Sequence, residues 1–173
     1  MEDTKAIIEA LIFASEMSLS VDKIADILSD VKKDDIERLI RELMMEYNGR
    51  SGGLYLQEVA GGFQFRTRED LGIWINKLRG GRSLMLTPAA METLAVVAYR
   101  QPVVKADIDR IRGVDVSGSL RGLLEKKLVR IMGRKDVPGK PIIYGTTKKF
   151  LEVFNMKDLS DLPTLRELKD LQE

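Results

Sequence analysis

The chain has 173 residues, of which 44% are hydrophobic and 32% charged, and its formal net charge is +1. It contains neither cysteine nor histidine, which excludes disulfides, thiolate metal sites and imidazole acid–base catalysis. No apolar run approaches the roughly 20 residues of a membrane helix, and the acidic N-terminal stretch is unlike a signal peptide, so an intracellular globular protein of one or two domains is expected.

Three helical patterns occupy the first 50 residues. A helix is predicted over 3–15, a second over 21–28 with Ser20 as its N-cap, and a third over 34–47. Their apolar residues recur at helical spacing and are expected to face a core; they are Ile7, Ile8, Leu11 and Ile12, then Ile24, Ile27 and Leu28, then Ile36, Leu39, Ile40, Leu43 and Met44.

A β-hairpin is predicted over 54–67. Apolar residues alternate along both halves of this segment, with Phe63 and Phe65 on the return strand. Gly61 and Gly62 are expected to form the tight turn between the strands.

A further helix is predicted over 68–79. Thr67 and Asp70 have the spacing of a capping box at its start. The apolar residues of this helix are Leu71, Ile73, Trp74 and Leu78. The glycine-rich stretch 80–83 is the best candidate for a linker.

The second half of the chain repeats the order of helices followed by a hairpin. Thr87 followed by Pro88 is typical of a helix start, and Gln101-Pro102 of a helix end. The expected elements are helices over 88–99, 104–111 and 117–127, strands over 129–133 and 141–145 around the Pro138-Gly139 turn, and a helix over 148–154.

Apolar positions in the two halves coincide at one offset of 84 residues. The matched pairs are Ala14 and Ala98, Ile24 and Ile108, Ile27 and Ile111, Ile36 and Leu120, and Leu39 and Leu123. Matches spread over three helices favour an internal duplication over chance.

The predicted fold is therefore mostly α with small β-hairpins, an α+β fold made of two tandem winged-helix domains. The expected divisions are 1–82, 83–156 and a C-terminal tail over 157–173. Leucines recur at every third position of the tail, at Leu159, Leu162, Leu165, Leu168 and Leu171. That spacing makes a poor coiled coil, and the tail could pack on its own domain, bind a partner or fray.

Charge is distributed unevenly along the chain. Residues 1–48 contain 6 basic and 12 acidic side chains, whereas 121–149 contain 9 basic and 2 acidic ones. A DNA-reading third helix needs exposed basic or amide side chains, and the acidic stretch 33–47 fails that test. The second unit could neutralise phosphates through its basic wing, so a DNA-binding winged-helix transcriptional regulator is the alternative to a protein-binding module.

Catalysis is not expected. The sequence has no phosphate-binding glycine motif. Ser117 and Ser119 near Lys126 are compatible with a Ser/Lys nucleophile pair, but no oxyanion loop accompanies them. We therefore expect a protein that is not an enzyme and that has no cofactor and no metal.

One resemblance is specific. The stretches LTPAAMETLAVVAYRQPV and IRGVDVSGSLRGLLEKKLVRIMGRKDVPGKPIIYGTTKKFLEVF resemble the bacterial segregation and condensation protein B (ScpB) family, as does the opening IIEALIFASEMSLSVDKIADIL. The resemblance implies a non-catalytic adaptor subunit of the SMC–kleisin condensin complex, acting in chromosome condensation and partition during cell division. It further implies a cytoplasmic, nucleoid-associated homodimer that binds the kleisin ScpA, reaches SMC through the kleisin, meets DNA mainly indirectly and has no membrane contact.

The resemblance also suggests which residues make these contacts. The N-terminal domain would form the dimer, with core and interface supplied by Ile8, Leu11, Ile12, Tyr55, Phe63 and Phe65. The C-terminal domain would hold the kleisin through Tyr99, Arg100, Gln101, Arg112, Arg121, Arg134 and Tyr144. Arginine and tyrosine are favoured anchors at protein interfaces.

Overall fold

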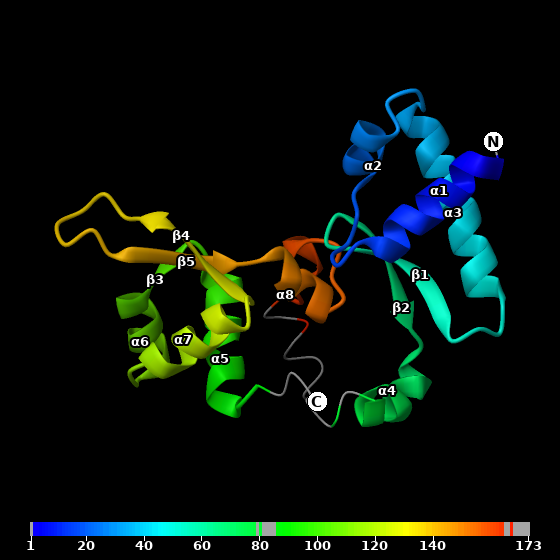
Figure 1. Ribbon diagram of the computed structural model, residues 1–173. Helices are drawn as coiled ribbons and strands as arrows, with labels where there is room; N and C mark the ends of the chain where they lie inside the picture. Colours follow the sequence, from blue (N-terminus) through cyan, green and yellow to red (C-terminus); the bar gives the residue numbers. More distant parts are fainter. Residues whose placement is uncertain (1, 79, 81–85, 165–166, 168–173) are drawn as a thin grey trace. The chain divides into compact units, whose positions relative to one another are not determined.

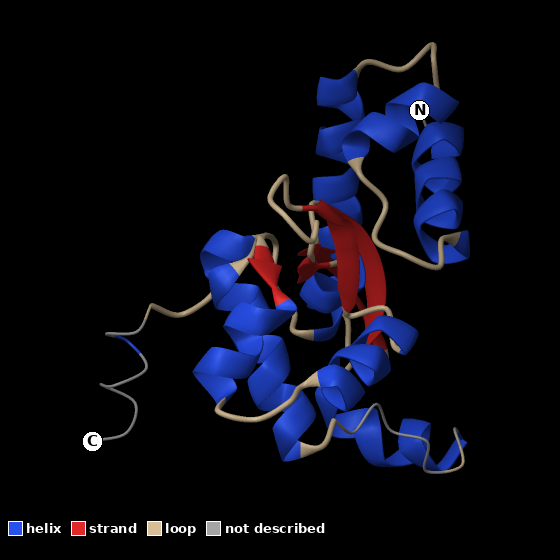
Figure 2. Cartoon of the chain, turned by 90° about the vertical axis from the view of Figure 1, so that its left-hand side faces the viewer, coloured by secondary structure: helices blue, strands red, loops and turns tan. Residues whose placement is uncertain are grey.

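The computed structural model of the chain describes residues 2–78, 80, 86–164 and 167, and it separates into two compact units, Met1–Ser83 and Leu84–Glu173. Helices form the larger part of each unit and strands form two small antiparallel sheets (Figures 1 and 2). The predicted α+β class is confirmed. None of the helices in the described ranges is long and apolar enough to cross a membrane.

Unit 1 begins with three helices around one apolar core. They are α1 (Glu2–Ala14), α2 (Val21–Ile27) and α3 (Lys33–Gly49). Ser20 caps α2 as predicted, because its hydroxyl accepts a hydrogen bond from the Lys23 amide. The buried side chains of this core come from all three helices and from the first strand: Ile8, Ile12, Ile24, Ile36, Leu39, Ile40, Leu43 and Leu56.

The hairpin of unit 1 consists of β1 (Leu54–Val59) and β2 (Gly62–Thr67). Its turn is centred on Ala60 and Gly61, both at positive φ, and the prediction of Gly61-Gly62 is wrong by one residue. Gly62 instead belongs to β2 and pairs with Val59. It is glycine for a different reason: the backbone of Leu19 passes so close that a Cβ on Gly62 would lie 2.7 Å from the Leu19 carbonyl carbon.

Replacing Gly62 by alanine is expected to destabilise unit 1 by about 1–3 kcal/mol, because backbone has to move to admit the methyl group. The Leu19–Phe63 bridge, with reciprocal N–H···O distances of 2.9 Å, would be distorted first. Gly49→Ala is the matched control, since nothing lies within 4 Å of its added Cβ. Urea unfolding of the two variants checks the difference, and equal midpoints would contradict this account.

The helix predicted over 68–79 is shorter than expected and is preceded by a 3-10 turn. The turn η1 covers Glu69–Leu71 and the helix α4 covers Gly72–Leu78. The predicted capping box is wrong. The Asp70 carboxylate accepts two 3.0 Å hydrogen bonds from the Arg68 guanidinium, and the cap residue is Arg68 rather than Thr67.

Unit 2 has the winged-helix order of three helices and a three-stranded sheet. Its elements are α5 (Pro88–Arg100), β3 (Val103–Val104), α6 (Lys105–Arg112), α7 (Ser117–Glu125), β4 (Val129–Arg134), β5 (Ile142–Thr146), α8 (Lys148–Val153) and the 3-10 turn η2 (Leu159–Asp161). Thr87 caps α5 as predicted, because its hydroxyl accepts a hydrogen bond from the Ala90 amide. The short strand β3 was not predicted from the sequence; it pairs with β5, which lies between β3 and β4.

The 84-residue offset is visible in the structure. Ile24 and Ile108 are both fully buried, each in the core of its own unit. The offset also relates Leu19 to Val103, the residues through which each unit adds a third pairing to its hairpin. Ile27 was predicted to face inward but is 48% exposed, and its match Ile111 is 50% exposed. The matched pairs thus include outward positions as well as core positions.

Candidate protein-binding site

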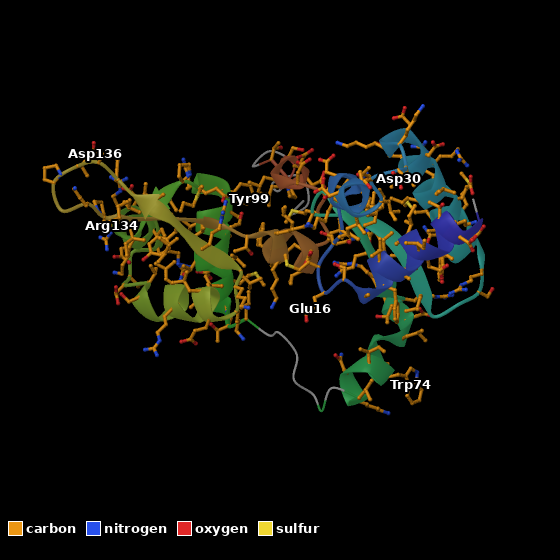
Figure 3. All side chains as sticks on the ribbon, turned by 45° about the horizontal axis from the view of Figure 1, so that its top comes forward. Glu16, Asp30, Trp74, Tyr99, Arg134 and Asp136 are labelled. Carbon is orange, nitrogen blue, oxygen red and sulfur yellow. The ribbon has the colours of Figure 1, made fainter. Side chains whose placement is uncertain are left out.

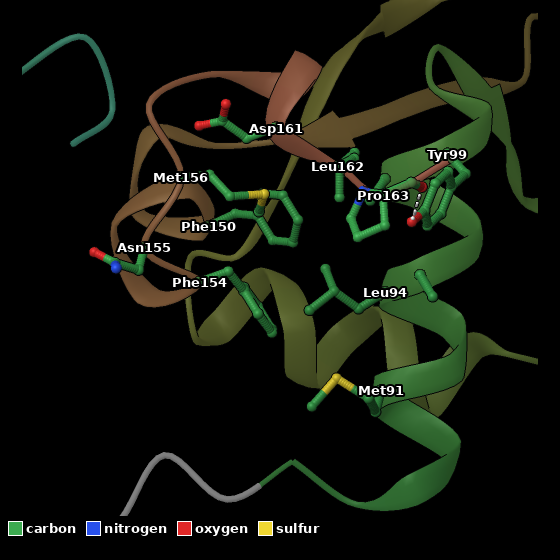
Figure 4. Close-up of a pocket in the computed structure, with 12 residues that line it drawn as sticks. Met91, Leu94, Tyr99, Phe150, Phe154, Asn155, Met156, Asp161, Leu162 and Pro163 are labelled. Carbon is green, nitrogen blue, oxygen red and sulfur yellow. Dashed lines mark hydrogen bonds between the residues drawn. The ribbon is translucent and has the colours of Figure 1, made fainter. Parts of the chain in front are cut away.

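An apolar groove of about 470 Å³ lies between α5 and α8 of unit 2 (Figure 4). Five residues of α5 form one wall, and the first four of them follow the i, i+3, i+4, i+7 spacing of a single helix face. Aromatic side chains of α8 and its C-terminal end form the opposite wall. The lining consists of Met91, Leu94, Ala95, Ala98, Tyr99, Phe150, Phe154, Asn155, Met156, Asp161, Leu162 and Pro163.

The groove remains partly accessible. Phe150 is buried and packs against Phe154 with ring centroids 5.0 Å apart, whereas Phe154 and Met91 are 37% and 43% exposed. Figure 4 shows Leu94, Phe150 and Phe154 pointing into the same space. An accessible apolar groove between helices is suited to holding the apolar side chains of another polypeptide.

The tail closes one side of this groove. Leu162 packs against the unit 2 core, and the Tyr99 hydroxyl donates a 2.7 Å hydrogen bond to the Pro163 carbonyl. Of the three alternatives for the tail, packing on its own domain therefore holds as far as Pro163. Leu165, Leu168 and Leu171 lie outside the described residues.

Gln101 has a structural role in unit 2. Its Oε1 accepts hydrogen bonds from the amide of Thr146 at 2.7 Å and from its hydroxyl at 3.0 Å. Its Nε2 donates to the Ala98 carbonyl at 3.0 Å. The side chain thus joins the C-terminal end of α5 to β5, and Thr146 is buried.

Gln101→Ala is expected to destabilise unit 2 by about 1–3 kcal/mol, because the buried Thr146 amide loses its acceptor. Arg100→Ala is the neighbouring control, since Arg100 is exposed, and its stability should change by no more than about 0.5 kcal/mol. Thermal melting of the two variants checks this. If both melt alike, Gln101 is not the brace that its contacts indicate.

Two more residues of the predicted kleisin set are engaged inside unit 2. Tyr144 is 8% exposed and belongs to the core, which corrects the expectation that it offers a binding surface. The Arg112 side chain is 13% exposed and forms an ion pair with Glu92 of α5. Both residues therefore support the unit, and neither presents its main surface to solvent.

The other members of the set do not form one surface. Tyr99 and Arg100 lie at the C-terminal end of α5. Arg121 is exposed on α7, where its Nε is 3.0 Å from the Glu125 carboxylate. Arg134 lies near the outer end of the β4–β5 hairpin (Figure 3). Of the seven predicted residues, Tyr99 alone lines the groove.

The residues predicted for the dimer interface of unit 1 include both buried core residues and partly accessible ones. Ile8 and Ile12 are 0% and 1% exposed, so they serve the core and have no surface to offer a partner, which corrects that part of the expectation. Phe63 and Phe65 pack against the same core and remain partly accessible, as does Leu11. Tyr55 pairs with Arg66 and therefore lies on the opposite face of the hairpin from Phe65, which pairs with Leu56.

An aromatic row on unit 1 was missed by the sequence analysis. Phe13 is 71% exposed and contacts Phe65 edge to face, with centroids 6.4 Å apart, and Phe65 contacts Tyr47 at 4.6 Å. The Arg50 guanidinium carbon lies 3.9 Å from the Tyr47 ring centroid. A hydrogen bond from the Tyr47 hydroxyl to the Glu9 carboxylate raises the pKa of Tyr47. This row joins α1, α3 and β2 beneath an accessible phenylalanine.

The turn between α6 and α7 is stabilised by ion pairs and hydrogen bonds among its own residues. Lys105 donates to Asp109 at 2.7 Å and also to Asp115, and the Asp109 carboxylate accepts the Val116 amide at 2.9 Å. The Lys105 ammonium is the main cause of the lowered pKa of both carboxyl groups. These groups stabilise the turn and are not arranged for catalysis. Within the described ranges, no cluster of three or more carboxylates could hold a metal.

The fold and the groove define a tandem winged-helix protein with accessible apolar surface suited to binding another polypeptide. Comparison with known proteins specifies it further. The family model for the segregation and condensation complex subunit ScpB matches residues 6–165. The segregation and condensation protein B of Syntrophotalea carbinolica is 46% identical over 98% of this chain and 85% of its own length. The chain belongs to the ScpB family.

Two solved structures are also similar. The crystal structure of ScpB from Mycobacterium tuberculosis is 31% identical, covers 88% of this chain and 95% of its own, and has a TM-score of 0.42. The crystal structure of a dimer of the ScpB N-terminal domain complexed with ScpA peptide is 32% identical. It covers 44% of this chain and 95% of its own, with a TM-score of 0.41.

Proposed function

We propose that this chain is a non-catalytic adaptor of the segregation and condensation complex, which acts as a homodimer and binds the kleisin ScpA. Family membership supports the complex, and the accessible groove on unit 2 is the observation that carries the adaptor role. In this proposal, a helical segment of the kleisin places apolar side chains against Met91, Leu94 and Phe154. SMC is reached through the kleisin.

The dimer is proposed to form through unit 1. An exposed phenylalanine above a row of aromatic contacts is costly in water and is typical of an interface anchor. Phe13, together with the accessible parts of Phe65 and Leu11, supplies such an anchor. The charges of α3 disfavour DNA on this unit, because its arginines pair with its own carboxylates, at 2.9 Å for Arg38 and Glu42.

The proposal is tested by titrating the full chain into a fluorescent peptide from the central region of the kleisin and following its anisotropy. Saturable binding is expected. Without peptide, light scattering coupled to size-exclusion chromatography should give the molar mass of a dimer. An unlabelled copy of the peptide should compete, and a scrambled copy should not. A protein that is monomeric and does not bind the peptide at micromolar concentration would overturn the adaptor role.

A further inference from the structure

We propose that the hairpin of unit 2 binds the phosphate backbone of duplex DNA without reading its sequence. Six basic side chains occupy this hairpin and the turn before it, and they are called the basic wing from here on: Lys126, Lys127, Arg130, Arg134, Lys135 and Lys140. Residues 126–141 contain a single acidic side chain, Asp136. Figure 3 shows Arg134 where β4 ends and Asp136 on the loop that follows.

The charges of the basic wing are not neutralised by the unit. Within the described part of the chain, none of the six forms an ion pair, and all but Lys126 are exposed. Unit 1 is different: Lys5, Lys33, Arg38 and Arg41 all pair with carboxylates of the same unit. The positive potential of the chain is therefore concentrated on the wing of unit 2.

Two arginines of the wing are positioned without losing their charge. Arg130 Nε donates to the Thr146 carbonyl at 3.2 Å, and Arg134 Nη1 donates to the Lys140 carbonyl at 3.0 Å. A neutral carbonyl fixes a guanidinium but does not neutralise it, so the remaining N–H groups stay available for phosphate oxygens. Arg130 lies near the start of β4 and Arg134 at its end, on either side of the irregularity between Ile131 and Gly133, so the two guanidinium groups occupy different parts of the hairpin surface.

The loop at the end of the hairpin is also ordered by its own backbone. The Lys135 amide donates to the Pro141 carbonyl at 2.9 Å, and the Lys140 amide donates to the Val137 carbonyl at 2.9 Å. A preformed loop loses little conformational entropy when its lysines meet a ligand.

The chemistry of the wing favours a duplex backbone over other nucleic-acid targets. Residues 126–141 contain no aromatic side chain on which an unpaired base could stack. The adjacent helix α7 offers Gly118, Ser119 and Gly122 where base-reading side chains would be needed. Binding through phosphates alone is therefore expected, with little dependence on sequence.

The test titrates the full chain into a fluorescently labelled duplex of mixed sequence and follows its anisotropy. The duplex has about 20 base pairs, or two helical turns, and the titration is repeated at salt concentrations from about 50 to 200 mM. The unaltered protein is expected to bind at low salt and to weaken steeply as salt rises. The double variant K135E/K140E should bind at least about tenfold more weakly, with a salt slope smaller by about 2. Single-stranded DNA of the same length should bind less tightly than the duplex.

The matched control is K23E/K32E, which changes the net charge by the same amount at two exposed positions of unit 1. It should retain duplex binding within about threefold, because the binding charges lie elsewhere. Failure of the unaltered protein to bind, or an equal loss in both double variants, would overturn the proposal. So would a wing variant that keeps the duplex and loses the kleisin peptide, since the wing would then serve a protein partner. The peptide titration alone decides the adaptor role, so the two proposals can fail separately.

Discussion

Ile12→Ala is expected to destabilise unit 1 by about 2–5 kcal/mol, whereas Phe13→Ala should change its stability by no more than about 1 kcal/mol. The two residues are adjacent in α1, but Ile12 is 1% exposed and Phe13 is 71% exposed. Removing the Ile12 side chain leaves a cavity in the core, while removing the Phe13 ring uncovers little. Urea unfolding followed by circular dichroism measures both differences.

The variants Ile12→Ala and Phe13→Ala also distinguish an effect on folding stability from an effect on dimer affinity. If unit 1 forms the dimer, Phe13→Ala should raise the dimer dissociation constant by at least about tenfold while the fold is kept. Sedimentation of dilute protein gives this constant. A variant that remains as tightly dimeric as the unaltered chain would remove Phe13 from the interface, and an unchanged stability of Ile12→Ala would contradict the described core.

Met91→Glu is expected to weaken binding of the kleisin peptide by about 10- to 100-fold, equivalent to about 1.4–2.7 kcal/mol. Met91 lines the groove of unit 2 and is 43% exposed, so the helix can accept glutamate without disturbing the core. An apolar ligand side chain seated there would have to desolvate the carboxylate.

Ala89→Glu is the control for this measurement. Ala89 lies in the first turn of the same helix, is exposed and does not line the groove, so the change in charge is identical. Anisotropy titrations of both variants, with melting curves to confirm that they fold, decide the result. Equal affinities for the two variants would show that the peptide binds elsewhere.

Helices and their caps were the most predictable features of this chain. Ser20 and Thr87 act as the N-caps expected of them, because a hydroxyl satisfies nearby amides whatever surrounds the helix. The capping box at Thr67 failed because Arg68 engages the Asp70 carboxylate that the motif requires. A local pattern cannot show which of two neighbours binds a shared carboxylate.

The two walls of the groove are visible in the sequence as apolar residues at helical spacing, although the sequence analysis did not predict a groove from them. Met91, Leu94, Ala95 and Ala98 form one helical stripe, and Phe150 and Phe154 are four residues apart on another helix. The pattern alone does not distinguish a stripe that is fully covered from one that remains open. Tyr144 and Gln101 were chosen for their residue types and proved to be a core residue and a brace.

Periodicity, caps and charge depend on residues close together in the chain, so the repeated winged-helix order, the acidic first unit and the basic wing were all predictable from the sequence. Tertiary structure alone decided which apolar residues stay accessible, as Ile12 and Phe13 illustrate. It also decided that Gly62 must admit the backbone of Leu19 and that Pro163 returns to Tyr99, 64 residues away. Such contacts join distant segments, and exposure and close approach follow from how those segments pack.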